Sequence, residues 1–160
     1  MEAFLRPGIG LENWVSRSNY PALNLVQTGP ATMSFFVNRN YGQPSSYLER
    51  YELRLDGFAS VHAGYKGGEM ITRPVRFRGA ELEINYSTSA AGSVRVEIQD
   101  ESGQPVTGYP LADARESIGD EIAGTVMWKS GPSVAKLMGR SVRLRFVLKD
   151  SDLFAYRFRD

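Results

Sequence analysis

The sequence predicts an all-β fold: an antiparallel β-sandwich of jelly-roll-like (concanavalin-like) type that follows an irregular N-terminal segment. Three observations support this. Several runs alternate between apolar and polar residues, as strands with one buried face do. Turn residues separate these runs about every ten residues. Only one short stretch has a helical pattern. We therefore divide the chain into an irregular segment, residues 1–30, and a sandwich domain, residues 31–160.

The clearest predicted strand is residues 141–150, SVRLRFVLKD, in which Val147 is the one exception to the alternation. The same period occurs in residues 51–58, 81–87 and 93–100. One face of each strand is expected to point into the core. The predicted core residues are Leu53, Leu55, Leu82, Ile84, Val94, Val96, Ile98, Val142, Leu144, Phe146 and Leu148.

The segments between these runs carry residues typical of turns. SAAG, residues 89–92, is predicted to separate two strands, and DESGQP, residues 100–105, to form a hairpin turn. KDSDL, residues 149–153, is predicted to be a turn before the last strand, FAYRF. The single helix candidate is residues 133–139, SVAKLMG, with serine at its start and glycine at its end. Its length allows only one or two turns.

The N-terminal 30 residues contain several prolines and glycines among apolar side chains that follow no period. We expect irregular structure without a core of its own. The segment is interpreted as the remnant of a neighbouring domain, whose apolar residues need a cover. Because apolar patches and open strand edges promote association, we expect the chain to self-associate through this region.

The composition indicates a globular protein and excludes several classes of function. Hydrophobic residues make up 42% of the 160 residues, and the formal net charge is +1. This balance gives no reason to expect nucleic acid or a membrane surface as a partner. The absence of cysteine excludes disulfides, cysteine-ligated zinc and a cysteine nucleophile. No apolar run approaches the roughly 20 residues of a membrane helix, and the N-terminus lacks the basic region of a signal peptide.

The only histidine, His62, lies in the predicted strand FASVHAG beside Ser60. Strand alternation places these two side chains next to each other on one face, which does not set a nucleophile against a base. We therefore expect a structural or surface role for His62. GYKGGE, residues 64–69, lacks the phosphate-loop pattern and precedes a strand, so it predicts a wide β-turn.

The densest acidic stretch is residues 113–122, DARESIGDEI. A solvated loop that caps one end of the sandwich is the favoured interpretation, with an ion site or an interdomain contact as alternatives. The stretch lacks the pattern of an EF-hand loop, and we expect no metal and no cofactor. The residues concerned are Asp113, Glu116, Asp120 and Glu121.

Three aromatic residues, Tyr65, Tyr109 and Trp128, are candidates for stacking against sugar rings. Aromatic residues also fill the cores of sandwiches. The sequence leaves both roles open, although the core is favoured.

Two long stretches, DGFASVHAGYKGGEMITRPVRF and LEINYSTSAAGSVRVEIQD, carry a resemblance that extends over nearly the whole chain. They resemble the C-terminal part of bacterial proteins related to the invertase and levanase type of glycoside hydrolase. The resemblance implies a five-bladed β-propeller followed by a β-sandwich, with the catalytic carboxylates in the propeller. The present chain would begin in the last blade, so no catalytic residue is carried over.

From this resemblance we expect a non-catalytic accessory domain that supports a propeller and contacts carbohydrate. The alternative is a lectin-like carbohydrate-binding module. The chain by itself is not expected to be an enzyme. Its expected partners are the preceding propeller, carbohydrate and a second copy of the chain.

Overall fold

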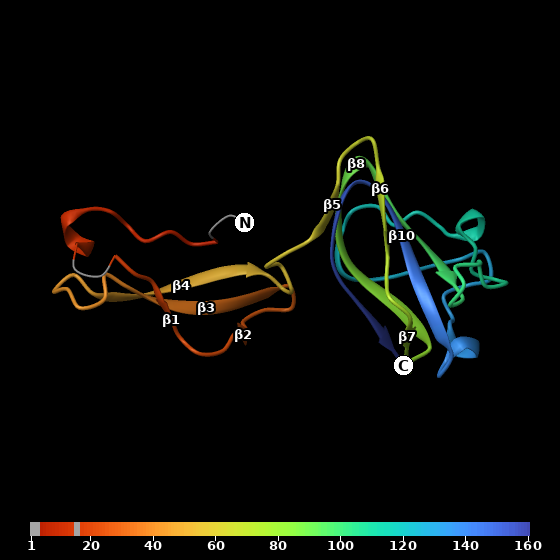
Figure 1. Cartoon of the computed structure of the whole chain (residues 1–160), viewed down its shortest axis with the longest axis horizontal. Helices are drawn as coiled ribbons and strands as arrows, with labels where there is room; N and C mark the ends of the chain where they lie inside the picture. The colour runs from red at the N-terminus through yellow and green to blue at the C-terminus, as the bar shows by residue number, and fades with distance from the viewer. Residues whose placement is uncertain (1–3, 15–16) are drawn as a thin grey trace. The chain divides into compact units, whose positions relative to one another are not determined.

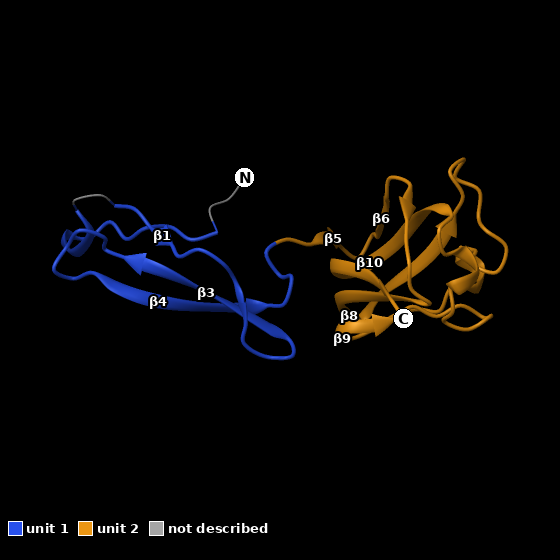
Figure 2. Cartoon of the chain, turned by 90° about the horizontal axis from the view of Figure 1, so that it is seen from below, with its two compact units in different colours: residues 1–58 blue, residues 59–160 orange. Residues whose placement is uncertain are grey.

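The computed structural model describes residues 4–14 and 17–160. The chain forms two compact units, residues 1–58 and 59–160 (Figure 2). Both consist of antiparallel strands, so the predicted all-β class is confirmed and the architecture is consistent with a β-sandwich. The finer jelly-roll assignment stays a prediction. Helical structure in the described ranges is limited to three short 3-10 turns, η1 (Leu11–Asn13), η2 (Leu111–Asp113) and η3 (Ala135–Leu137).

Unit 1 contains a small sheet around β3 (Thr32–Arg39). β4 (Tyr47–Arg54) pairs with the whole length of β3 on one side. Two short strands, β1 (Tyr20–Pro21) and β2 (Val26–Gln27), pair with different parts of its other side (Figure 1). The rest of the N-terminal segment that the structure describes is irregular apart from η1, as expected.

The boundary between the units differs from the predicted division after residue 30. It lies after Phe58 because β1 and β2 pair with β3, which joins the N-terminal segment to the hairpin that follows it. Sequence periodicity could not reveal this, since two-residue strands have no period of their own.

Unit 2 is organised around two 19-residue strands, β8 (Glu81–Gln99) and β10 (Ser141–Arg159), which pair with each other (Figure 1). β9 (Asp120–Thr125) adds to the free side of β8. Three short strands pair with the other side of β10: β5 (Val61–Ala63), β6 (Gly68–Ile71) and β7 (Val75–Arg76).

Two predicted turns, residues 89–92 and 149–153, prove to lie inside β8 and β10. The register shifts where they meet, since Ser93 pairs with Lys149 and Thr88 pairs with Ser151. A Cβ atom at Gly92 would lie only 2.3 Å from the carbonyl oxygen of Asp150. The glycine-containing turn signal therefore marks a bulge and a close approach of two backbones, not the end of a strand. The predicted hairpin turn at residues 100–105 is present, with Asp100 N donating to Gln104 O at 2.9 Å.

The core of unit 2 contains nine of the eleven predicted core residues, all of them on β8 and β10. The other two, Leu53 and Leu55, belong to unit 1 and are only half-buried. The buried core of unit 2 consists of Ala63, Phe77, Leu82, Ile84, Tyr86, Val94, Val96, Ile98, Tyr109, Val126, Trp128, Val134, Leu137, Val142, Leu144, Phe146, Leu148 and Leu153.

Candidate functional site

An open depression of about 530 Å³ lies on the outer face of the sheet of unit 2. Of the lining residues on β8 and β10, Arg95, Val147 and Lys149 alternate with core residues, so their side chains point away from the core. The wide turn that follows β5 completes its wall. The lining residues are Tyr65, Lys66, Gly67, Gly68, Glu69, Arg95, Val147, Leu148 and Lys149.

The turn between β5 and β6 fixes the position of Tyr65. Gly67 N donates to Gly64 O at 2.9 Å and closes the predicted β-turn. Gly67 has a φ of +79°, a left-handed conformation that glycine adopts without strain. Tyr65 is 68% exposed, and the ammonium of Lys149 lies 4.7 Å from the centroid of its ring. The tyrosine therefore presents an aromatic surface beside a cation.

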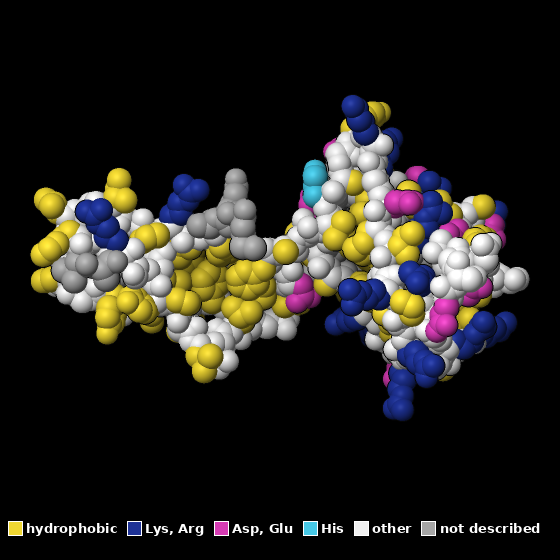
Figure 3. All heavy atoms as spheres, viewed as in Figure 1, with side chains coloured by type: hydrophobic (Ala, Val, Ile, Leu, Met, Phe, Trp, Pro, Cys, Tyr) yellow, Lys and Arg dark blue, Asp and Glu magenta, His cyan; other side chains and the backbone are white. Residues whose placement is uncertain are grey.

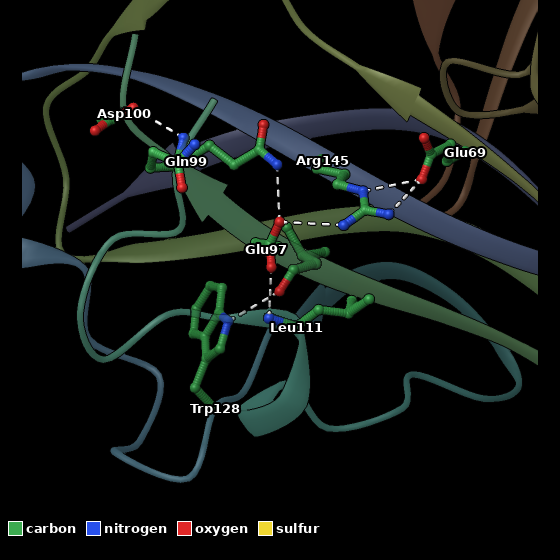
Figure 4. Close-up of polar contacts among 9 residues, drawn as sticks. Glu69, Glu97, Gln99, Asp100, Leu111, Trp128 and Arg145 are labelled. Carbon is green, nitrogen blue, oxygen red and sulfur yellow. Dashed lines mark hydrogen bonds and ion pairs between the residues drawn. The ribbon is translucent and has the colours of Figure 1, made fainter. Parts of the chain in front are cut away.

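A buried carboxylate, Glu97, lies on β8 two residues after Arg95 (Figure 4). Its oxygens accept hydrogen bonds from Leu111 N at 2.9 Å and Gln99 Nε2 at 2.8 Å. Arg145 on β10 donates to Glu97 at 3.3 Å and to Glu69 at 2.6 and 2.9 Å. One guanidinium thus holds two carboxylates.

This hydrogen bonding determines the charge state of Glu97. Burial alone would raise the pKa of its carboxyl group, but the donors from Leu111, Gln99 and Arg145 outweigh burial and lower the pKa. The same holds for Glu83. Burial raises the pKa of its carboxyl group, but the hydrogen bonds from Arg157 and Arg159 outweigh burial, so the pKa is lowered. Both carboxyl groups are therefore ionised and neutralised by arginine.

Of the three aromatic candidates, only Tyr65 is available to a ligand. Trp128 is fully buried, and its Nε1 donates to Val96 O at 2.9 Å. Tyr109 packs edge-on against Trp128 at 5.2 Å between ring centroids and donates its hydroxyl to Ser133 O at 2.8 Å. Trp128 and Tyr109 are core residues, so their assignment as sugar-stacking residues is corrected. Their buried polar atoms have the partners that aromatic core residues require.

The four acidic candidates are engaged locally. Asp113 pairs with Lys129 at 2.7 Å, and Glu116 accepts from Ser93 Oγ at 3.4 Å. Asp120 and Glu121 lie on β9, not in a loop. The pKa of Tyr86 is raised mainly by burial, and the negative charges of Glu121 and Asp120 raise it further. Within the described residues, no group of three or more His, Asp or Glu side chains lies close enough to hold a metal ion.

His62 is a strand residue on β5, as predicted, and is paired in register with Asp152 on β10. Its Nδ1 lies 3.2 Å from Asp152 Oδ1, and Ser60 Oγ donates to the same oxygen at 2.6 Å. Both side chains converge on one carboxylate atom, so histidine does not stand between serine and aspartate as catalysis requires.

A second depression, of about 450 Å³, lies beside η3 and includes Asp100, Lys136 and Arg140. Asp100 accepts hydrogen bonds from Ser102 Oγ at 2.7 Å and from the backbone of Gln104 at 2.9 Å, which lower its pKa. Its carboxylate stabilises the turn after β8, which is a structural role.

Sequence reasoning missed Glu97 and Arg145. Both stand at polar positions of strands that were correctly predicted, but only the register Arg145↔Glu97 makes them neighbours. The sequence shows only that opposite charges occur on the polar faces of two strands. This does not predict which residue of one strand lies opposite which residue of the other.

A comparison with protein-family models, with curated proteins and with solved structures found no match to this chain. The described part of the chain contains no helix that is both long and apolar enough to cross a membrane.

Proposed function

We propose that the chain is a non-catalytic β-sandwich accessory module of a glycoside-hydrolase-like protein, and that unit 1 packs against a preceding β-propeller. The observation that carries this proposal is the apolar surface of unit 1. Figure 3 views one face, where hydrophobic side chains gather over unit 1. Of the eighteen large hydrophobic side chains that are exposed among the described residues, twelve belong to it: Phe4, Ile9, Leu11, Trp14, Tyr20, Leu23, Leu25, Val26, Tyr41, Tyr47, Leu48 and Phe58.

This surface surrounds a cluster of aromatic rings. Phe35 on β3 lies 5.8 Å from Phe4, 5.4 Å from Tyr51 and 5.8 Å from Phe58, measured between ring centroids. Phe35 is buried, whereas Phe4 and Phe58 remain exposed. Exposed apolar patches of this kind mark interaction surfaces. A neighbouring β-domain would remove them from water and would also cover the open edge of β4.

The chemistry of the buried carboxylates supports a non-catalytic role. A general acid in glycoside hydrolysis needs a raised pKa, so that it holds its proton at neutral pH. Glu83 and Glu97 have lowered pKa values instead, because arginine and backbone donors stabilise their ionised forms. Each carboxylate acts as a structural anchor between strands.

Hydrogen exchange tests the proposed docking. Amides of β3 and β4 should exchange more slowly in the parent protein that contains the propeller than in the present chain. Amides of β8 and β10 should exchange at the same rate in both, which provides an internal control. Equal exchange of β3 and β4 in the two proteins would contradict the docking of unit 1.

Activity assays test the non-catalytic role. The intact chain should hydrolyse no fructosides, arabinosides or xylosides. Turnover that disappears in Asp120→Asn or Glu121→Gln would contradict this proposal and would assign catalysis to β9.

A second candidate function, a lectin-like carbohydrate-binding module, is favoured by one observation. Tyr65 presents its ring to solvent at the edge of the depression on unit 2. Exposed aromatic rings pack against the carbon-bound hydrogens of sugars while polar neighbours bind the hydroxyl groups.

A further inference from the structure

We propose that the depression beside Tyr65 binds an acidic saccharide, an oligosaccharide of uronic acids. In this site Tyr65 packs against a sugar ring, and the cations Arg95, Lys149 and Lys66 bind its carboxylates. The inference rests on the second candidate function, and it specifies the charge of the ligand.

The sheet register brings the charged side chains together. Val147 on β10 lies opposite Glu69 on β6 and opposite Arg95 on β8, which forms one row across three strands. Lys149 follows two residues later on β10 and therefore points to the same side. Lys66 and Tyr65 come from the turn that leads into β6.

The acidic residues near the depression are already engaged. Glu69 and Glu97 both accept hydrogen bonds from Arg145. Glu116 accepts from Ser93 Oγ, on the strand that carries Arg95. The guanidinium of Arg145 therefore offsets the negative charge of Glu69 and Glu97.

The cations of the depression lack a carboxylate partner in the described structure. In the described part of the chain, Arg95 and Lys66 form no hydrogen bond or ion pair through their side chains, and the ammonium of Lys149 has one cation–π contact, with the ring of Tyr65. Three positive groups thus line one shallow site, and the carboxylate that also lines it, Glu69, is held by Arg145. Such a site attracts anions.

The aromatic wall distinguishes a saccharide from a simple anion. A phosphate or sulfate ion would use the cations alone, whereas a uronic acid offers an apolar ring face as well as a carboxylate. Arginine binds carboxylates through two parallel N–H donors, which suits the planar group of a uronate. The depression of about 530 Å³ is in the size range of small-ligand sites.

Calorimetric titration of the intact chain with trigalacturonate tests the proposal, with the fully methyl-esterified trisaccharide as the neutral match. The acid should bind about tenfold or more tightly than the ester, and the difference should shrink at high salt. Arg95→Gln should weaken binding of the acid about fivefold and leave the ester unaffected. Lys136→Gln makes the same charge change beside η3 and should alter neither.

Tyr65→Ala should weaken both trisaccharides about fivefold or more, because each loses the aromatic surface. Ile118→Ala, at another exposed apolar site of unit 2, is its control. Thermal melting of each variant establishes that the fold is intact.

Three outcomes would overturn the proposal. Equal binding of acid and ester would contradict charge recognition but leave the lectin-like function in place. Binding of the acid that sodium sulfate displaces at similar concentration, and that Tyr65→Ala does not change, would indicate a simple anion site. Absence of binding by both trisaccharides would contradict this inference and count against the lectin-like function as well.

Discussion

The two units pair long antiparallel strands in the same way but bury them differently. In unit 2, β8 and β10 supply apolar side chains to a continuous buried cluster, and Leu82, Val94 and Leu144 are fully inaccessible. In unit 1, β3 and β4 pair over eight residues, yet β3 has buried residues and β4 has none. Alternation therefore identifies a strand and its apolar face, but it does not show what covers that face.

The difference also concerns polar groups. Unit 2 buries Glu83 and Glu97 and neutralises each with arginine from β10. An ion pair of unit 1, Arg39–Glu49, joins two neighbouring strands at 3.4 Å, and its carboxylate is more exposed than Glu83 and Glu97 are. Buried ion pairs must be complete to be tolerated, whereas exposed pairs contribute little to stability. Unit 2 is thus the region in which single substitutions should have large effects.

The largest effect is expected for Leu144→Ala. The side chain is fully buried in the core of unit 2, so its removal leaves a cavity and should lower the free energy of unfolding by about 2–5 kcal/mol. Leu48→Ala is the matched control in unit 1, where the side chain is exposed, and should stay within about 0.5 kcal/mol.

Urea denaturation followed by fluorescence measures both costs, because each unit contains one tryptophan. The chain has two tryptophans, exposed Trp14 in unit 1 and buried Trp128 in unit 2. A Trp14→Phe background isolates the signal of unit 2 for Leu144→Ala, and Leu48→Ala is compared with wild type, which retains the signal of Trp14. Equal effects of the two leucine substitutions would contradict the contrast between the units.

A smaller effect is expected for Gly92→Ala in the bulge of β8. The added methyl group would lie 2.3 Å from Asp150 O and 2.7 Å from Lys149 O, so one backbone must move. Overpacking of this kind should cost about 1–3 kcal/mol in urea denaturation. Gly8→Ala in unit 1 meets no atom within 4 Å and is the control. A neutral Gly92→Ala would show that β8 and β10 do not approach so closely.

A pH-dependent effect is expected for Glu97→Gln. At pH 7 the neutral amide loses its charged contact with Arg145 and brings a donor group toward the donors of Leu111 and Gln99. The cost should be about 1–2 kcal/mol. Glu69→Gln removes the half-exposed carboxylate from the same guanidinium and should cost no more than about 1 kcal/mol.

The pH dependence follows from the lowered pKa of Glu97, whose ordinary value is 4.5. A carboxyl group with a lowered pKa stabilises the folded chain above its ordinary pKa, and this contribution disappears as the pH falls through the lowered value. The difference between wild type and Glu97→Gln should therefore shrink below pH 4.5. Glu83 titrates in the same direction in both proteins and cancels. A difference that stays constant with pH would contradict the ionised state of Glu97.

The sequence was sufficient to predict most of unit 2 but little of unit 1. Val142, Leu144, Phe146 and Leu148 are buried as their alternation indicates. The pairing of β1 and β2 with β3 had no periodic signal, so the sequence did not indicate the division after Phe58. Tyr65 and Trp128 are both aromatic, so the sequence offered them equally as sugar-stacking candidates. Tertiary packing exposes the first and buries the second.

The smallest effect on folding, together with a change in association, is expected from polar substitutions in unit 1. Leu23 is 90% exposed, so Leu23→Ser and Leu48→Ser should each change the free energy of unfolding by no more than about 0.5 kcal/mol. Wild-type protein should self-associate, because its apolar surface has no cover in the isolated chain. The double variant should shift toward monomer in light scattering at equal concentration. Ile118→Ser, an exposed site on unit 2, should leave the association of wild type unchanged. If the wild type is monomeric, or if the double variant associates as the wild type does, unit 1 is not an interaction surface. Loss of association in Ile118→Ser would assign that surface to unit 2.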